Sequence, residues 1–434
     1  MQAELDAQYS ILEQELPEFV REGGRLAVIK APPGSGKTHL LITVLKQLIE
    51  SGMRVAVATQ TNAQADDVSR RFYQRDPHLR VTRFVSGTHG VASDWPSAIG
   101  WESKTGDLPH GPGVVVSTSA KWAVTTIGAP FDLLAIDEAW QMSWADLMQC
   151  ATISERFLLI GDPGQIPPVV TVDVRRWETS PRAPHVAAPD VVLNDPSLSA
   201  QALVRTLPAC RRLPHESVAF VRPFYDFDFA PYGAMGAAGI DTPNGHPLAR
   251  IGDGRPVVVS LATPVEGPPP EVDHGLADAA ATVVASLLET ESFVRRVVAT
   301  RRVTAADIGI SSSHRAMNST IDAALKGRFP GVRVDTPERW QGLERPIMIA
   351  VHPLSGVINP SAFDLETGRL CVMASRHTAG LVVLTRDHIG ETLANLVPSA
   401  EQAPGRPDTV GRGHDAHVRF WSALVDADRI VKFM

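Results

Sequence analysis

Short apolar runs alternate along the chain with longer stretches in which apolar residues recur every three or four positions. The short runs predict buried strands, and the longer stretches predict helices that bury one face. In the first part of the chain, the predicted strands lie at residues 26–29, 54–59, 81–84, 114–116, 131–136 and 157–160. Because helical stretches separate these strands, the pattern predicts a parallel sheet that is covered by helices on both faces.

The same alternation returns in the second part of the chain, after a proline- and alanine-rich stretch at 169–200 that is predicted to be an insertion or linker. Strands are predicted at 256–262, 308–311, 332–334, 347–351 and 381–384, and helices at 276–288, 317–325 and 370–375. Residues 232–255 and 267–270 are predicted to be loops, and residues 417–433 a helix that docks on the body. The predicted domains are therefore 1–200, 201–397 and a tail at 398–434.

A glycine-rich turn joins the first predicted strand to the first helix that follows it. Its glycines leave room for backbone N–H groups to converge on phosphates, its lysine supplies a positive charge, and its threonine offers a hydroxyl to Mg²⁺. The candidate residues are Gly34, Ser35, Gly36, Lys37 and Thr38. Ala31 stands where this pattern usually has its first glycine, and alanine fits there if its φ is negative. The turn predicts ATP and Mg²⁺ as cofactors, and the alternative is an ordinary turn that happens to precede a helix.

Two acidic residues follow the predicted strand at 131–136, at the edge where the carboxyl ends of parallel strands meet. Asp137 is predicted to hold Mg²⁺ through water, and Glu138 to polarise the water that attacks the γ-phosphate. The next strand leads into a loop at 161–168 that is stiffened by glycine and proline. Gln165 in this loop is predicted to contact the γ-phosphate, and the alternative is an ordinary turn.

Composition narrows the class of protein. The chain has 434 residues, of which 44% are hydrophobic and 21% are charged, so it is long enough for two or three domains. No apolar run approaches the roughly 20 residues of a membrane span, and the N-terminus lacks the basic start of a secretion signal. We therefore expect a cytoplasmic protein without a membrane segment. The three cysteines, Cys150, Cys210 and Cys371, are far apart and are expected to be core thiols.

The formal net charge of −7 does not indicate nucleic-acid binding by the whole molecule, so such a role depends on local charge. One candidate patch consists of Arg70, Arg71, Arg75, Arg80 and Arg83. A solvated helix face with its loop has the same composition, so the patch has two interpretations. Trp340 also has two interpretations, because it could stack on a base or pack in the core. Trp140 and Trp144 are expected to pack in the interior.

The order of these motifs resembles that of superfamily 1 helicases, in the 5′-to-3′ branch with compact accessory regions. After the glycine-rich turn, the Asp-Glu pair and the Gln165 loop, stretches at 207–214, 308–317, 334–344 and 370–376 are similar to further motifs of this family. The resemblance implies two RecA-like parallel-sheet lobes with helices on both faces. It also implies that ATP binds in the cleft between the lobes.

The resemblance assigns further residues to the nucleotide. In the family, two arginines contact the γ-phosphate from the second lobe, which implies this role for Arg212 and Arg376. A Gln-Gly-x-Glu motif faces the nucleotide and implies contacts from Gly342 and Glu344. Gln14 lies where the family has an adenine-reading glutamine, and Gln8 is the alternative.

Contacts to a nucleic-acid strand are implied in both lobes. Those of the first lobe are Thr61, Asn62 and Thr118, and those of the second are His314, Arg315, Thr336 and Gln341. The family usually has tyrosine where this chain has His314, so stacking on a base at that position is left open.

These assignments imply an ATP-dependent translocase or helicase on single-stranded nucleic acid, with DNA favoured over RNA. Hydrolysis would be coupled to closure of the lobes, and a nuclease or loader complex is a conceivable protein partner. A second hypothesis is an ATP-gated clamp or loader subunit that remodels a partner complex without separating a duplex. A third, an ATPase unrelated to nucleic acid, is disfavoured by the motifs between Thr336 and Arg376.

Overall fold

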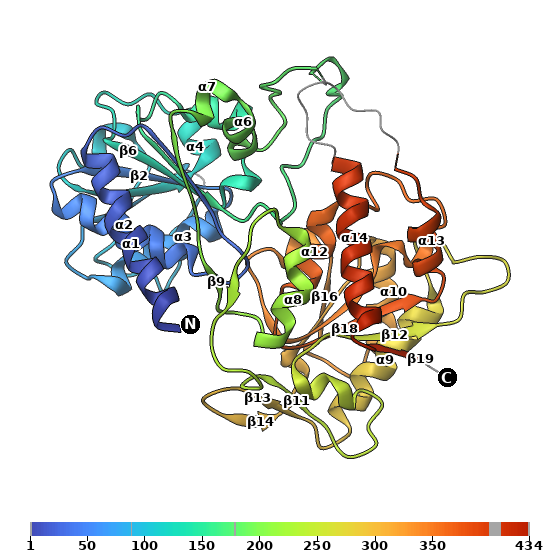
Figure 1. The fold of residues 1–434 in the computed structure, drawn as a ribbon. Coiled ribbons are helices and arrows are strands. Elements are labelled where there is room, and N and C mark those ends of the chain that lie inside the picture. The colour runs from blue at the N-terminus through green and yellow to red at the C-terminus, as the bar shows by residue number, and fades with distance from the viewer. Residues whose placement is uncertain (1, 88, 178, 399–408, 433–434) are drawn as a thin grey trace. The chain divides into compact units, whose positions relative to one another are not determined.

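The computed structural model describes residues 2–87, 89–177, 179–398 and 409–432. These residues form two compact units (Figure 1). The first unit comprises described residues up to Pro163 together with Pro167–Pro208, and the second comprises Gly164–Ile166 and the described residues from Ala209 onward. Each unit has one large sheet of its own.

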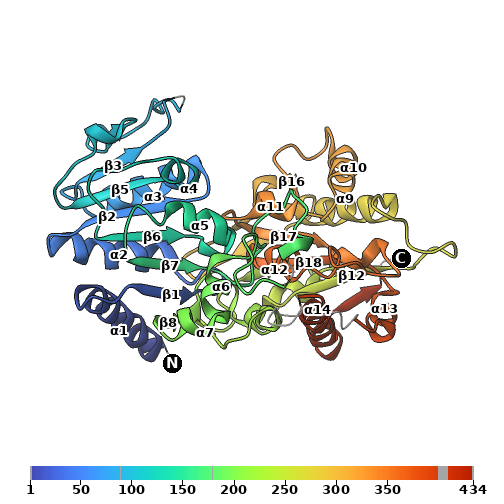
Figure 2. The same cartoon turned by 90° about the horizontal axis from the view of Figure 1, so that it is seen from above.

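The sheet of the first unit is parallel throughout and has the strand order β4-β3-β5-β2-β6-β7-β1-β8, part of which can be followed in Figure 2. Its strands are β1 (Leu26–Lys30), β2 (Arg54–Thr59), β3 (Val81–Phe84), β4 (Gly100–Glu102), β5 (Gly113–Thr118), β6 (Leu133–Asp137), β7 (Phe157–Gly161) and β8 (Ala202–Thr206). The main helices are α1 (Gln2–Arg21), α2 (Lys37–Glu50), α3 (Asn62–Arg75), α4 (Ser119–Ala123), α5 (Trp144–Cys150), α6 (Ala188–Asn194) and α7 (Pro196–Ser199). One face of the sheet is covered by α4, α5 and α6, and α1, α2 and α3 lie on the other.

The second unit repeats this plan with a parallel sheet in the order β16-β15-β17-β18-β12-β19. Its strands are β12 (Val257–Leu261), β15 (Ile308–Ser311), β16 (Arg333–Asp335), β17 (Arg345–Val351), β18 (His377–Arg386) and β19 (Ile430–Lys432). The main helices are α8 (Val218–Val221), α9 (His274–Leu288), α10 (Arg315–Leu325), α11 (Pro337–Trp340), α12 (Thr367–Ala374), α13 (Ile389–Asn395) and α14 (Thr409–Asp426).

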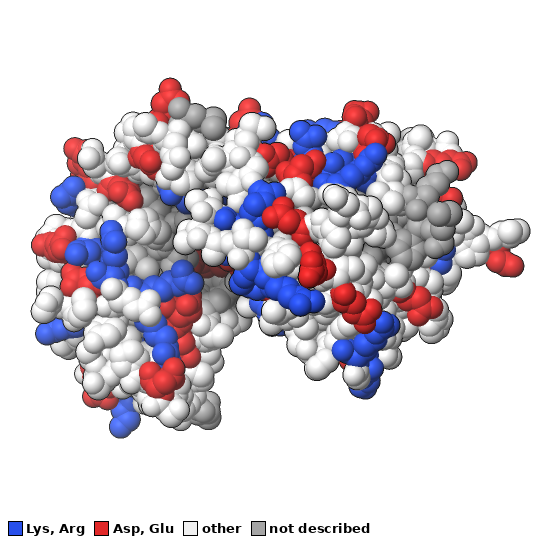
Figure 3. All heavy atoms as spheres, turned by 90° about the horizontal axis from the view of Figure 1, so that it is seen from below, with Lys and Arg blue, Asp and Glu red and all other residues white. Residues whose placement is uncertain are grey.

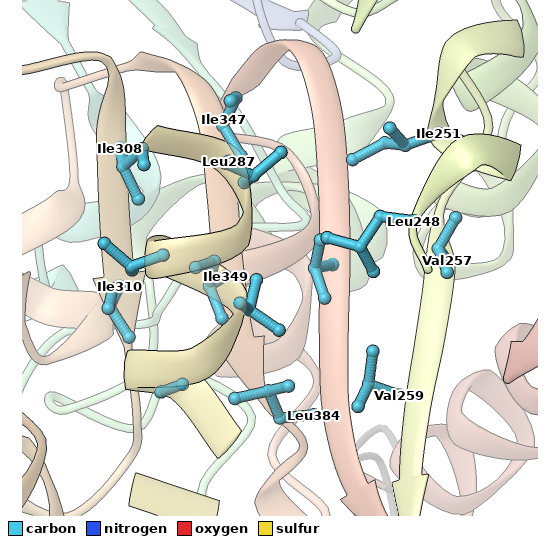
Figure 4. Packing of buried hydrophobic residues seen from close by; sticks show 14 of the residues in the cluster. Leu248, Ile251, Val257, Val259, Leu287, Ile308, Ile310, Ile347, Ile349 and Leu384 are labelled. Carbon is cyan, nitrogen blue, oxygen red and sulfur yellow. The ribbon is translucent and has the colours of Figure 1, made fainter. Parts of the chain in front are cut away.

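Two apolar clusters cover the two faces of this second sheet. In the first, drawn in Figure 4, Leu287 of α9 packs against Ile310 and Ile349 of the central strands. In the second, residues of α8, α12 and α14 pack on the opposite face. The predicted fold class, two parallel sheets with helices on both faces, is therefore confirmed.

Three local predictions were wrong. The stretch 232–255 is not only loop, because β11 (Gly239–Asp241) pairs antiparallel with β13 (Phe293–Arg295), which in turn pairs with β14 (Thr300–Arg302). Residues 202–206 form β8 beside β1, in the sheet of the first unit, although the predicted boundary lay at residue 200. The stretch 169–200 is not a plain linker, because it contains α6 and α7, and Val191 and Val192 of α6 are buried.

The C-terminal helix also differs from its prediction. It begins at Thr409 and ends at Asp426, because Asp428 adopts a left-handed φ of 53° and turns the chain into β19. Arg429 is buried there and binds the carboxylate of Asp253 at 2.8 Å, which fixes the start of the strand. Part of the predicted tail, 399–408, lies outside the described residues.

Trp340 is a core residue. Its side chain is fully buried, and its Nε1 donates a hydrogen bond to the carbonyl oxygen of Ile310 at 3.0 Å. Trp140 is buried as well, with its Nε1 donating to Asp190. The packing interpretation of both tryptophans is thus confirmed, and base stacking by Trp340 is excluded in this arrangement.

Two further expectations concern cysteines and membranes. The three cysteines are buried free thiols, as expected for core residues. Among the helices that the structure describes, none combines the length and the apolar character needed to cross a membrane.

Helix α14 docks on the second unit through a pair of buried histidines. The ring of His417 meets that of His352 edge to face, with centroids 5.4 Å apart. Within the described part of the chain, neither ring nitrogen of His417 has a hydrogen-bond partner, nor does Nε2 of His352. Burial lowers the pKa of His417 to about 3, helped by nearby His414, and burial also lowers the pKa of His352, helped by His417 and His388. Both rings are therefore neutral at pH 7.

Acid should weaken the second unit through this pair. Because the pKa values of the folded state lie below the unfolded value of about 6.5, stability is fully present above that pH and falls below it, by about 1.4 kcal/mol per pH unit for each histidine. Urea unfolding at pH 7 and pH 5 measures the loss, and His417→Leu should lose clearly less than the native chain. An identical loss in both proteins would contradict this role of His417.

Candidate nucleotide and strand sites

The glycine-rich turn contains two glycines in a left-handed backbone conformation. Gly34 and Gly36 have φ of 63° and 89°, a left-handed conformation that side chains rarely adopt. Ala31 is not among the residues with positive φ, and its backbone N–H donates to the carbonyl oxygen of Gly161 at 2.9 Å, which continues the pairing of β1 with β7. Ala31 therefore meets the condition for alanine at this position, which is that its φ is not positive.

Helix α1, which was not predicted, supports this turn. Tyr9 is buried and its hydroxyl donates a hydrogen bond to the backbone carbonyl of Ser35 at 2.5 Å. Sequence reasoning missed Tyr9, although Leu5, Tyr9, Leu12 and Leu16 show the helical spacing that would have revealed it. The side-chain Oγ of Ser35 is itself buried and has no hydrogen-bond partner in the described residues. A buried hydroxyl of this kind fits a site that is completed by a phosphate oxygen.

The lysine and the catalytic candidate lie together. Nζ of Lys37, the first residue of α2, is 2.9 Å from Oε1 of Glu138. Glu138 follows β6 and has a φ of 54°, one of three non-glycine residues with positive φ in the described part of the chain. Backbone strain of this kind often accompanies functional sites, because the surrounding structure must hold the residue in place. Lys37 and Glu138 are thus fixed relative to each other at the carboxyl edge of the first sheet.

Asp137, the last residue of β6, directly precedes Glu138 and is buried. Its Oδ1 accepts a hydrogen bond from the backbone N–H of Glu138 at 3.0 Å. Burial and the neighbouring charge of Glu138 raise the pKa of Asp137 to about 7, against the opposing charge of Lys37. A divalent cation would favour the charged form of such a carboxylate.

The donor chemistry fits Mg²⁺. Thr38 and Asp137 offer hard oxygen atoms, and Mg²⁺ is usually held by one or two such groups together with substrate phosphates and water. No cluster of three or more potential metal-ligating side chains exists among the described residues, so the residues alone do not form a complete metal cage. Thr38 and Asp137 would accordingly hold a cation that arrives with the nucleotide.

In the second unit, Arg212 contacts two stretches that were also predicted to face the nucleotide. Its Nε donates to Oε2 of Glu344 at 2.8 Å, and its Nη1 donates to the carbonyl oxygen of Ser375 at 3.4 Å. Arg376, the next residue, is buried to 99% at the end of α12. Gly342 precedes Glu344 by two residues and has a positive φ of 76°. Arg212 and Glu344 thus pair within this unit, and Arg212 also reaches the backbone directly before Arg376.

The remaining nucleotide candidates differ in surroundings. Gln165 belongs to the second unit, where its backbone carbonyl lies so close to Gly368 that an added Cβ at Gly368 would meet it at 2.7 Å. Ile166, the next residue, is buried in the apolar cluster of α12 and α14. Gln14 and its alternative Gln8 are both exposed on α1, so the structure does not choose between them.

The strand candidates of the first unit lie at the carboxyl ends of β2 and β5, which are paired neighbours. Thr61 caps α3 by accepting from the backbone N–H of Gln64, and Thr118 caps α4 in the same way. Asn62 accepts a hydrogen bond from Nη2 of Arg83 at 2.7 Å. These three side chains therefore share one sheet edge, where Thr61 and Thr118 also stabilise the helices that begin there.

The predicted arginine patch is wrong in part. Arg83 is fully buried, where its Nε donates to Asp66 at 2.7 Å and burial lowers its pKa. Arg70 binds both carboxylate oxygens of Asp94. On the face of the molecule drawn in Figure 3, basic and acidic residues are interspersed and form no extended basic surface. The arginines at 70 and 83 are thus structural residues, which a charge count alone does not reveal.

The strand candidates of the second unit follow adjacent strands. Thr336 directly follows β16 at the start of α11, and His314 and Arg315 follow β15, which pairs directly with β16. Gln341 comes one turn later, after α11. Four predicted contacts therefore lie along one carboxyl edge, the position at which open parallel sheets bind ligands.

Comparison with known proteins finds one family model, two curated relatives and several solved structures. A family model described as an AAA domain matches residues 13–187. The "DNA replication ATP-dependent helicase/nuclease DNA2" of Saccharomyces cerevisiae is 25% identical over 181 residues, which are 39% of this chain and 12% of that protein. The "DNA replication ATP-dependent helicase/nuclease JHS1" of Arabidopsis thaliana is 27% identical over 148 residues, which are 33% of this chain and 11% of that protein. The chain thus matches only a small part of the length of either relative.

Solved structures of viral helicases are also similar. Arterivirus nonstructural protein 10, a helicase, aligns with a TM-score of 0.44 and 17% identity over 83% of this chain and 59% of that one. The PRRSV helicase aligns with a TM-score of 0.43 and 16% identity over 84% and 54%.

Proposed function

We propose that this chain is a member of superfamily 1 of the helicases and an ATP-driven motor that translocates along single-stranded nucleic acid. The proposal includes hydrolysis of ATP with Mg²⁺, coupling of hydrolysis to closure of the two units, and 5′-to-3′ movement. DNA is favoured over RNA as the track, because both curated relatives are named DNA replication helicases.

The observation that carries the proposal is the arrangement around Lys37. Left-handed glycines on one side and the Lys37–Glu138 pair on the other surround the start of α2. Bound ATP with Mg²⁺ supplies a phosphoryl group whose transfer needs little covalent help from the protein. Lys37 would bind its charge, Asp137 and Thr38 would hold the cation, and Glu138 would accept a proton from the attacking water.

The second unit would supply the remaining groups. Arg212 and Arg376 are proposed to stabilise charge that develops on the transferring phosphoryl group, and Gln165 to respond to its presence. Arg212 is held in the second unit by Glu344, a partner that it would exchange for the phosphate when the nucleotide binds. Because the side chain of Glu344 is 51% exposed, breaking this ion pair costs little.

The rate of ATP hydrolysis with single-stranded DNA, with single-stranded RNA and without either polymer tests the proposal. We expect one of the polymers to stimulate hydrolysis, because a translocating motor hydrolyses ATP faster when it is bound to a strand. Equal turnover in all three mixtures would favour an ATPase unrelated to nucleic acid.

A second function, an ATP-gated clamp or loader subunit, is favoured by the small accessory elements. In the described residues, the second unit carries two small sheets beside its main sheet. These are the antiparallel sheet β11-β13-β14 and the two-stranded sheet of β9 (Ala209–Cys210) and β10 (Ala230–Pro231). A subunit of this kind would work with a partner such as a nuclease, an activity that both curated relatives have in their names. Unwinding of a tailed duplex by the purified chain would exclude this second function, whereas strand-stimulated hydrolysis without unwinding would support it.

A further inference from the structure

An exposed aromatic residue continues the row of strand candidates in the second unit. Phe363 is 43% exposed and lies after β17, the strand that pairs with β15. Its ring centroid is 5.7 Å from that of His314, which follows β15, with the two planes inclined by 38°. The carboxyl edge of this sheet therefore presents Thr336 after β16, His314 after β15 and Phe363 after β17.

Arg369 holds the ring of Phe363 in place. The guanidinium carbon of Arg369 lies 4.0 Å from its centroid, a cation–π contact. Arg369 is itself fixed by Glu366 at 2.7 Å and by Glu338 of α11 at 3.2 Å. Nη1 of Arg369 also donates to the carbonyl oxygen of Phe363 at 3.4 Å. The aromatic surface is thus positioned before any ligand arrives, which lowers the entropy that binding must offset.

His314 also lines a small pocket of about 30 Å³. Ser355 and His352 line the same pocket, and each is at least 98% buried. Within the described residues, Oγ of Ser355, Nε2 of His352 and Oγ of the pocket residue Ser313 have no hydrogen-bond partner. Buried polar atoms normally have partners, so three such atoms around one pocket indicate a missing polar group. The volume admits one polar group of about the size of a water molecule, and it is too small for a base.

We propose that these residues form a nucleotide-binding subsite for the single strand, an inference that rests on the proposed function. A base stacks on the surface made by Phe363 and His314, and one oxygen of the sugar-phosphate backbone enters the pocket beside His314. A lone exposed phenylalanine would need no explanation, but this one adjoins both a second ring and a pocket with unsatisfied polar atoms.

Charge around the subsite indicates that stacking supplies most of its affinity. Glu271 lines the pocket, and Asp273, which also lines it, is neutralised by Arg386 at 2.7 Å. Arg315 is an exposed basic residue beside His314. Because positive and negative groups are balanced, loss of Phe363 should lower affinity by a similar factor at low and at high salt, and it should do so for every base.

Equilibrium binding of a fluorescent oligo-dT strand to Phe363→Ala tests the subsite. We expect about tenfold weaker binding, the effect of losing one stacked base. Phe363→Leu should lose about as much, because it keeps an apolar side chain without an aromatic face, and Phe363→Tyr should bind as the native chain does. Ile358→Ala is the matched control, since Ile358 is an apolar residue of the same unit that is 60% exposed. Unfolding midpoints of all variants show whether the fold is intact.

An abasic strand of equal length separates stacking from other effects. On this strand, the native chain and Phe363→Ala should bind equally. The subsite would be overturned if Phe363→Ala bound oligo-dT as the native chain does, or if it lost as much on the abasic strand. If the native chain itself bound no single strand, the proposed function would fail first and the subsite with it.

Ser355→Ala identifies the oxygen that enters the pocket. An equal loss of affinity for DNA and RNA indicates a phosphate oxygen, which both polymers have. A loss restricted to RNA indicates the 2′-hydroxyl. No loss with either polymer would overturn the pocket as part of the subsite.

Discussion

Glu138→Gln is expected to lower ATP turnover by about 10²–10⁴-fold, the usual contribution of a general base. The amide has the same shape and can still accept a hydrogen bond from Nζ of Lys37, which lies 2.9 Å from the carboxylate in the native chain. It cannot accept a proton from water. Affinity for ATP should therefore change little while hydrolysis is lost, and a phosphate-release assay together with equilibrium nucleotide binding measures both quantities.

The matched control for this change is Glu155→Gln. Glu155 is also in the first unit, its side chain is 83% exposed, and its ion-pair distance to Arg25 is 3.8 Å. The control should hydrolyse ATP as the native chain does. Turnover by Glu138→Gln at the native rate would show that the water is activated by another group, and the role of Glu138 would have to be withdrawn.

Arg212→Ala should reduce turnover even more strongly, by about 10³–10⁵-fold, if its guanidinium acts as an arginine finger. The side chain is only 15% exposed and reaches Glu344 and the carbonyl oxygen of Ser375, so it is already ordered at the edge of the second unit. Arg212→Lys keeps the charge but not the planar pair of donors, and it should recover only part of the activity. ATP affinity, measured separately, should fall much less than turnover.

Arg328→Ala serves as the control in the same unit, because its side chain is 61% exposed and pairs with Glu289 on the surface. It should have no effect on turnover. An Arg212→Ala protein that hydrolyses ATP within a few fold of the native rate would exclude Arg212 from the reaction.

Residues close in sequence produced the most accurate predictions. The run from Leu26 to Thr38 contains its strand, its left-handed glycines and its helix start within a few residues, so local pattern is enough to place them. The Asp137–Glu138 pair follows from the same reasoning, because a buried strand ends there. The left-handed conformation of Glu138 was not predicted, because a positive φ is normally predicted from a sequence only at glycine.

Features that depend on distant partners were missed. Tyr9 reaches a turn 26 residues away, and β8 pairs with β1 across more than 170 residues, as β19 does with β12. The charge of Arg83 suggested a surface site, but Asp66 and Asn62 allow it to be buried. Phe363 is not signalled by any motif, because its position beside His314 arises only when β15 and β17 pair.

The most direct test of the motor is the time that the chain needs to reach the end of a strand. Single-turnover experiments with oligo-dT strands of increasing length, each with a fluorophore at the 3′ end, measure this time after ATP is added. A lag that grows in proportion to strand length at the 3′ end, and no such lag at a 5′ label, is the predicted result. A signal that is independent of length at both ends would contradict translocation and leave the chain as a clamp.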